Sequence, residues 1–230
     1  MLTEVTGSAS MTGLHQFVLD PATWSAPASP SALAPFPGKA VAGSRRWAGR
    51  RDGPAVRHAC PVSVPFPEPT TALPSRSEVF LGYLDYFRSR LVSKLRALRD
   101  DELRRSELPS GWTPAELLNH LAYVELRWLE WGFEGRDVEE PWADSRDSRW
   151  HVAASESLDD LVTALTAQAA RTRAIVESHD LADVGQPGER WNGADPPALE
   201  RILLHLLQEY ARHVGHLDIV SELAGGQAGE

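Results

Sequence analysis

Glu209 and His213 are the residues of this sequence whose types and spacing first suggest chemistry. They stand four positions apart in the stretch 199–223, LERILLHLLQEYARHVGHLDIVSEL, whose apolar residues recur with a helical period. In a helix of 3.6 residues per turn the two side chains lie within about 40° of each other, so they share a face. The same face carries five further residues: Ile202, Leu206, Tyr210, Leu217 and Val220. The carboxylate and the imidazole are therefore predicted to point toward a hydrophobic core.

A carboxylate on such a face needs compensation, because burying an unpaired ionised Glu costs on the order of several kcal/mol. A Glu and a His one helical turn apart can both ligate one divalent cation, which would supply that compensation. A Lys or an Arg could supply it as well. Two interpretations stay open: a metal site, or a metal-free cluster in which Glu209, His213 and an Arg pair with one another.

His120 is the best candidate for a third ligand. It lies in the stretch 113–131, TPAELLNHLAYVELRWLEW, at the edge of the apolar side of another predicted helix. Structural zinc sites are normally closed by four residues, whereas three protein ligands and an open position are typical of catalytic sites. We therefore expect His120, Glu209 and His213 to hold a divalent metal ion.

Three more residues near these positions have alternative interpretations. His205, one turn before Glu209, could be a ligand in a shifted triad. His216, three residues after His213, could support the ligands or act as an acid or base, or it could lie at the surface. Arg127 could bind an anionic substrate or cofactor, or it could form a salt bridge with a carboxylate of the bundle.

Local signals predict the helices that would hold these residues. Apolar residues recur at threes and fours from Ser77, which predicts a helix of about 22 residues. Thr113 and Glu116 have the spacing of a capping box, and a Pro occupies the first helical position between them. This pattern predicts the start of a helix that runs to about Phe133. Ser157, followed closely by two Asp residues, caps a third helix of similar length.

The final helix and the connections complete the predicted fold. Asp195, before two prolines, is expected to open the last helix, and the glycines at 225–226 are expected to end it. The connection 135–156 is long for a compact domain, and Trp142 and Trp150 are expected to anchor it. Without a credible strand ladder, the pattern predicts an all-α four-helix bundle over residues 77–226.

Composition limits the possible partners. The net charge of -9 argues against a nucleic-acid-binding surface, and no apolar run is long enough to span a membrane. The first residues do not resemble a signal peptide, so a cytoplasmic location is expected. Cys60 is the only cysteine, which excludes an intramolecular disulfide and a Cys-rich zinc site.

Residues 1–76 differ in kind from the rest. They hold 11 of the 17 prolines, and their charge is 7 basic minus 4 acidic, or +3, against 16 minus 28, or -12, for residues 77–230. We interpret them as a disordered extension, with a small subdomain built on their aromatic residues as the alternative. Both methionines lie in this part, so translation of the natural protein from a point nearer Ser77 is a further hypothesis.

Three segments together resemble the DinB-like superfamily, especially its actinobacterial branch related to mycothiol-dependent enzymes. They are HLAYVELRWLEWGFEG at 120–135, the long connection with its Pro-Trp pair, and ILLHLLQEYARHVGHLDIVSEL at 202–223. The resemblance covers roughly residues 77–226. It implies a four-helix bundle that carries a divalent metal, usually zinc, on one His of the second helix and two residues four apart on the last. In this chain those positions are His120, Glu209 and His213.

The resemblance also implies an activity. A low-molecular-weight thiol, mycothiol in this branch, would bind the open position of the metal, which lowers the pKa of the thiol and holds the thiolate beside an electrophile. We therefore predict a metal-dependent thiol S-transferase, or a related isomerase or hydrolase, and a possible homodimer. The alternative is a non-enzymatic metal-binding or ligand-binding stress-response protein of the same superfamily.

Overall fold

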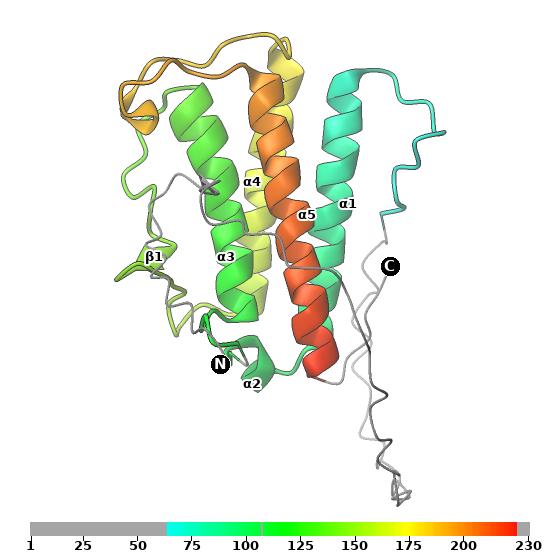
Figure 1. Ribbon diagram of the computed structural model, residues 1–230, viewed down its shortest axis with the longest axis vertical. Helices are drawn as coiled ribbons and strands as arrows, with labels where there is room; N and C mark the ends of the chain where they lie inside the picture. Colours follow the sequence, from blue (N-terminus) through cyan, green and yellow to red (C-terminus); the bar gives the residue numbers. More distant parts are fainter. Residues whose placement is uncertain (1–63, 107, 225–230) are drawn as a thin grey trace, which may run out of the picture. The chain divides into compact units, whose positions relative to one another are not determined.

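Four long helices dominate the described chain and lie side by side as a bundle (Figure 1). The computed structural model describes residues 64–106 and 108–224. Its long helices are α1 (Arg76–Ala97), α3 (Pro114–Glu125), α4 (Leu158–Ser178) and α5 (Leu199–Leu223). A π-helix, η2 (Leu126–Phe133), continues α3 without a break. The predicted all-α four-helix bundle is confirmed.

Side-chain caps determine where three of the helices begin. Ser75, Thr113 and Ser157 each accept a hydrogen bond from the backbone amide three residues further on. Thr113 and Ser157 also form reciprocal capping boxes with Glu116 and Asp160. The predicted starts of the second and third helices are therefore confirmed, and the first helix begins within one residue of its predicted start.

The start of α5 follows a different principle, and the predicted start at Asp195 is wrong. The N-cap residue is Ala198, whose side chain makes no capping bond. The first two amides of the helix donate instead to the carbonyl oxygens of Asp183 and Leu181, both at 2.9 Å. These acceptors lie far back in the α4–α5 connection, so no local signal marks the start. The predicted end at 225–226 lies outside the described residues.

Four short elements lie in the connections. A single turn, α2 (Asp100–Leu103), follows α1. In the long connection, β1 (Ser145–Arg146) pairs with β2 (Arg149–Trp150) across a two-residue turn in which both residues have positive φ. A 3-10 turn, η3 (Glu189–Trp191), lies between α4 and α5. The sequence predicted no strand ladder. This prediction is wrong, because the described residues contain the short hairpin β1–β2.

Most of the predicted Pro-rich extension, 1–76, lies outside the described residues, and so do Cys60 and both methionines. The described part, 64–75, contains turns and bends without helix or strand. Phe66 rests edge-on against Tyr83 and Tyr86 of α1, with ring centroids 5.6 and 5.1 Å away. This end of the segment therefore packs on the bundle.

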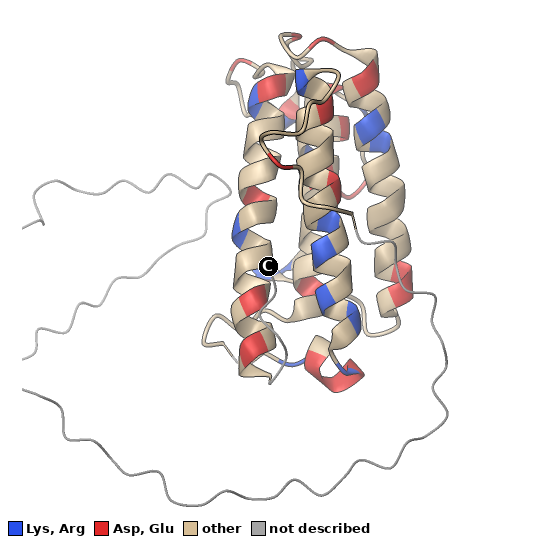
Figure 2. Ribbon diagram, turned by 90° about the vertical axis from the view of Figure 1, so that its right-hand side faces the viewer, with Lys and Arg blue, Asp and Glu red and all other residues tan. Residues whose placement is uncertain are grey.

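Acidic and basic residues are interspersed along the helices (Figure 2). Many of them pair across helices, as Arg173 of α4 does with Glu78 and Asp85 of α1 at 3.4 and 2.9 Å. None of the described helices combines the length and the apolar composition that a membrane crossing requires.

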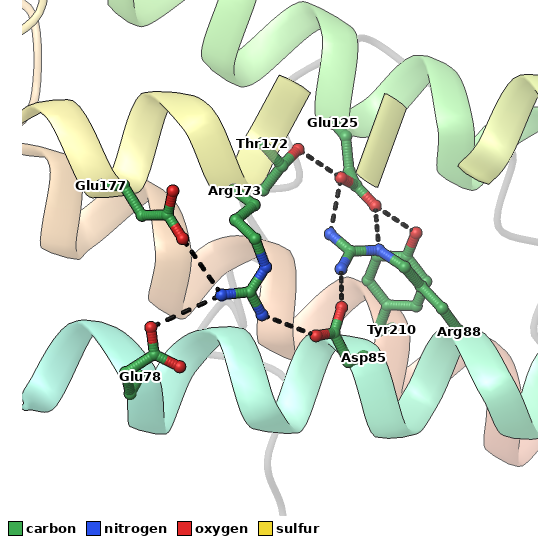
Figure 3. A network of polar contacts seen from close by, with 8 residues as sticks. All are labelled: Glu78, Asp85, Arg88, Glu125, Thr172, Arg173, Glu177 and Tyr210. Carbon is green, nitrogen blue, oxygen red and sulfur yellow. Dashed lines mark hydrogen bonds and ion pairs between the residues drawn. The ribbon is translucent and has the colours of Figure 1, made fainter. Parts of the chain in front are cut away.

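A buried polar network joins all four long helices (Figure 3). Glu125 of α3 is fully buried and accepts from the Nε and Nη2 atoms of Arg88 of α1, at 2.8 and 2.7 Å. It also accepts from the hydroxyls of Tyr210 of α5 and Thr172 of α4. Burial alone would lower the pKa of Arg88, but the charges of Glu125, Tyr210 and Asp85 and the hydrogen bond to Glu125 together outweigh burial and raise it.

This network corrects one assignment and positions a candidate ligand. The sequence pattern placed Tyr210 in an apolar stripe; its ring is indeed buried, but its hydroxyl belongs to the network. Tyr210 directly follows Glu209 in α5. The bond to Glu125 therefore fixes the rotation of α5 against α3 at the level where Glu209 must face the interior.

We expect Arg88→Met to lower the free energy of unfolding by about 3–5 kcal/mol, because it leaves the buried Glu125 carboxylate without its cation. Arg173→Met is the matched control, since it removes a guanidinium from partly exposed ion pairs that contribute less than about 1 kcal/mol. Urea unfolding followed by circular dichroism measures both. Equal losses in the two variants would contradict the special weight of the buried pair.

Candidate metal centre

The structure brings together His120 of α3 with Glu209 and His213 of α5. Each offers one ligand atom, and these atoms all lie within 4.8 Å of one another. Glu209 and His213 are buried, with exposures of 5% and 7%, and His120 is partly buried. The Nε2 atom of His213 lies 3.1 Å from Oε2 of Glu209. Two imidazoles and one carboxylate form a donor set that could hold a metal ion.

A second carboxylate supports this group from outside. Asp144, 1% exposed in the connection before β1, places its Oδ2 atom 3.0 Å from Nδ1 of His120. A carboxylate bonded to one ring nitrogen of a His orients the ring and leaves the other nitrogen available as a ligand. The Nδ1 bond therefore leaves Nε2 of His120 for a metal. Nothing local in the sequence indicates this role for Asp144, which lies 24 residues from its partner.

Arg127 of η2 holds Asp144 in place. Its Nη1 atom donates to Oδ1 at 2.6 Å and to the carbonyl oxygen of Pro141 at 3.1 Å, and its Nη2 atom donates to Oδ2 at 3.1 Å. The guanidinium also lies over the Trp142 ring, 4.3 Å from its centroid. Arg127 is 3% exposed and forms a salt bridge with Asp144. The predicted salt bridge therefore exists, but its carboxylate belongs to the connection and not to a helix of the bundle. Its predicted role in binding a substrate or cofactor stays a prediction.

The protonation states of this pair suit a metal ligand. Burial lowers the pKa of His120 and outweighs the bond from Asp144, which acts in the opposite direction. Burial would raise the pKa of Asp144, but the hydrogen bonds from His120 and Arg127 prevail and lower it. A neutral imidazole beside an ionised carboxylate is the combination in which a His binds a divalent cation.

Glu209 is an ionised carboxylate among imidazoles. Burial would raise its pKa, but the bond with His213 and the charges of His213, His205 and His120 bring it to about 2. Among the described residues no Lys or Arg pairs with Glu209, which removes the Arg on which the metal-free interpretation depends. The Nδ1 atom of His213 is buried and has no hydrogen-bond partner. An unneutralised carboxylate beside a ring nitrogen without a partner fits a site for a divalent cation.

The other predicted site residues lie around this group. His205 places its Nε2 atom 3.5 Å from Oε1 of Glu209, but it is not one of the three grouped donors. His216 is exposed, with its ring centroid 5.5 Å from that of His213. Burial, together with the charges of His213 and Arg212, lowers the pKa of His216.

Aromatic rings form the walls of the candidate site. Trp150 of β2 stacks on His120 at 4.1 Å between centroids and meets His213 edge-on at 5.2 Å. Trp112 follows at 6.0 Å from Trp150, and Trp128 lies 4.4 Å from His205. The expected anchoring role of Trp150 is therefore joined by contact with two candidate ligands. Trp142, the other expected anchor, is 46% exposed and packs on Arg127.

Comparisons with known proteins give one family. Residues 79–226 match the family model described as mycothiol-S-transferase. Among solved structures, the chain is similar to a DinB-like protein from Bacillus cereus ATCC 10987, with 18% sequence identity and a TM-score of 0.48; the alignment covers 66% of this chain and 95% of that one. A search of curated proteins finds no match.

We expect the full chain, loaded with zinc and desalted, to retain about one zinc ion per molecule, and Glu209→Ala or His213→Ala to retain less than about a tenth of that amount. Each substitution removes one of three ligands. Inductively coupled plasma mass spectrometry measures the content. His205→Ala is the matched control on the same helix and should keep its zinc; loss of zinc in His205→Ala but not in His120→Ala would instead establish the shifted triad.

Asp144→Asn is expected to weaken zinc binding by about 10–100-fold, because an amide carries no charge to hold and polarise His120. A competition titration with a chromogenic chelator measures the dissociation constant. Asp137→Asn, an exposed residue of the same connection, serves as the control. Thermal unfolding of both metal-free variants separates a loss of ligand orientation from a loss of fold, and an unchanged zinc affinity in a folded Asp144→Asn protein would contradict the role of Asp144.

Proposed function

The chain belongs to the mycothiol-S-transferase family, and from this premise we propose that it transfers mycothiol to an electrophilic small molecule at a divalent metal ion, with zinc as the expected ion. The relation to mycothiol-dependent enzymes, predicted from the sequence motifs, is confirmed by this family membership. The observation that carries the proposal is the convergence of His120, Glu209 and His213 from two helices.

The three residues suit a catalytic centre. Three protein ligands leave one coordination position for a substrate, whereas a structural zinc site is normally closed by four. A divalent cation bound there would supply a Lewis acid that favours the thiolate over the thiol at neutral pH. Asp144 and Arg127 support the proposal as the pair that orients His120, and Trp150 shields the two imidazoles from water on one side.

The proposed reaction is a nucleophilic displacement or addition. The thiolate sulfur forms a bond to the electrophilic carbon, and a leaving group departs with the electron pair of the bond that breaks. In an addition there is no leaving group: the electron pair of the π bond that breaks moves onto the neighbouring carbon, which takes up a proton. We assign the removal of the thiol proton to His216, because it is exposed beside His213 and its lowered pKa keeps it neutral and able to accept a proton. The homodimer and the cytoplasmic location stay predictions.

We expect the zinc-loaded chain to accelerate the loss of free mycothiol in the presence of 1-chloro-2,4-dinitrobenzene, and His120→Ala and Glu209→Ala to return the rate to that of the uncatalysed reaction. Both substitutions remove a metal ligand, so the thiolate is no longer held. Thiol titration and the absorbance of the thioether product measure the rate. His179→Ala, a partly exposed His away from the donor group, should leave it unchanged.

A panel of other thiols and electrophiles extends this test to the alternative function. Full zinc loading without consumption of any thiol would contradict the transferase and favour a protein that binds a metal or ligand without catalysis. Activity that survives in His120→Ala would contradict the assignment of the site.

A further inference from the structure

Arg190 of η3 is a cation that no carboxylate of residues 64–106 and 108–224 neutralises. Its guanidinium carbon lies 4.1 Å from the centroid of the Trp128 ring, 5.6 Å from that of Trp191 and 5.9 Å from that of Trp131. Its Nε atom is buried and has no hydrogen-bond partner, although the side chain as a whole is partly exposed. Among the described residues no Asp or Glu pairs with it.

Partial burial of a guanidinium without an anionic partner costs free energy, and the pKa of Arg190 reflects this cost. Removal from water lowers the pKa of Arg190 to about 10, and the nearby charge of Arg127 acts in the same direction. Stacking on aromatic rings recovers part of the lost hydration, but it satisfies no N–H donor. A buried donor without an acceptor calls for an explanation, and a ligand that brings its own acceptors is one.

The surrounding chain holds Arg190 in place. The indole Nε1–H of Trp191 donates to the carbonyl oxygen of Gln186 at 2.7 Å, and the amide of Gln186 donates to the carbonyl oxygen of Phe133 at 2.8 Å. Trp191 also lies so close to Gly132 that a Cβ atom there would meet its ring at 2.9 Å. The 3-10 turn is therefore fitted against η2, and the position of Arg190 is fixed by buried contacts.

Arg190 and the candidate metal centre share a neighbour. The Trp128 ring that lies under the guanidinium also contacts His205, at 4.4 Å between centroids. His205 in turn lies 3.5 Å from Glu209. One aromatic ring and one imidazole therefore link the unpaired cation to the donor group. Arg127 differs from Arg190 in this respect, because Asp144 already neutralises it.

We propose that Arg190 binds a carboxylate of the electrophilic substrate and that Trp128 and Trp131 stack on the remainder of that substrate. A planar guanidinium matches a carboxylate with two parallel hydrogen bonds, and indole rings favour a flat, electron-poor partner. The identity of the ligand as the electrophile rests on the proposed function, whereas the anion site does not depend on turnover.

Binding of an inert probe tests the anion site directly. Isothermal titration calorimetry compares 3,5-dinitrobenzoate with 3,5-dinitrobenzamide, which has the same ring but no charge, on the full zinc-loaded chain. We expect Arg190→Met to weaken binding of the benzoate by about 10-fold or more and to leave binding of the amide unchanged. Arg190→Lys should show an intermediate loss, since it keeps the charge without the planar fork.

Arg201→Met is the matched control, because this exposed Arg of α5 makes no ion pair among the described residues. It should bind the benzoate like the unaltered protein. Thermal unfolding of each variant shows that the fold persists. Benzoate affinity that survives in a folded Arg190→Met protein would overturn the proposal. Two alternatives predict this result: binding of the benzoate carboxylate to the zinc ion, and a carboxylate of the full chain that already pairs with Arg190.

A kinetic comparison separates this proposal from the proposed function. With mycothiol and 4-chloro-3,5-dinitrobenzoate, the sulfur–carbon bond forms as chloride leaves with the electron pair of the carbon–chlorine bond. The thiol proton passes to His216 and from there to solvent. We expect Arg190→Met to raise the KM for this substrate by about 10-fold or more and to leave kcat, and both constants for the corresponding amide, nearly unchanged. Arg190-dependent binding without turnover would refute the transferase and keep the anion site, whereas turnover indifferent to Arg190 would refute only the anion site.

Discussion

The burial of ionised carboxylates inside an apolar bundle is the constraint on which this structure depends. The three most buried carboxylates of the described chain are Glu125, Asp144 and Glu209, with exposures of 0%, 1% and 5%. Arg88 neutralises the first and Arg127 the second, each through two hydrogen bonds to the carboxylate. Within the described part of the chain, the ion-pair partners of Glu209 are imidazoles. A cation bound between those imidazoles and Glu209 would complete the same pattern a third time.

The two neutralised carboxylates each position one half of the donor group. Glu125 holds the hydroxyl of Tyr210, which is next to Glu209, and so fixes the face that α5 turns inward. Asp144 holds the ring of His120 on α3, and Arg127 ties Asp144 to the start of η2, which continues α3. The ligands therefore come from two helices, but buried ion pairs fix the orientation of both. This division explains why the site tolerates a long connection beside it.

The donor group was predictable because its signals are local. Glu209 and His213 share a face through their four-residue spacing, and the capping box at Thr113 sets the register that turns His120 inward. The supporting residues were not predictable, because Glu125 meets Arg88 and Asp144 meets His120 only after the helices have assembled. The same reason accounts for the wrong start of α5, whose first amides bond to carbonyl oxygens of a distant connection. The family resemblance supplied the activity, which no spacing in the sequence could specify.

Two charged side chains near the site, one negative and one positive, have no fully charged partner among the described residues. Glu209 is an anion without a guanidinium or ammonium partner, and Arg190 is a cation without a carboxylate among the described residues. Both are linked through His205 and Trp128. An ion pair between Glu209 and Arg190 would stabilise the folded protein. Instead, the Trp128 ring contacts the guanidinium of Arg190, and His205 contacts the carboxylate of Glu209. In the two proposals, these charges would serve separate ligands, a metal ion at Glu209 and an anionic group at Arg190, so that the site would hold the thiol and the electrophile side by side.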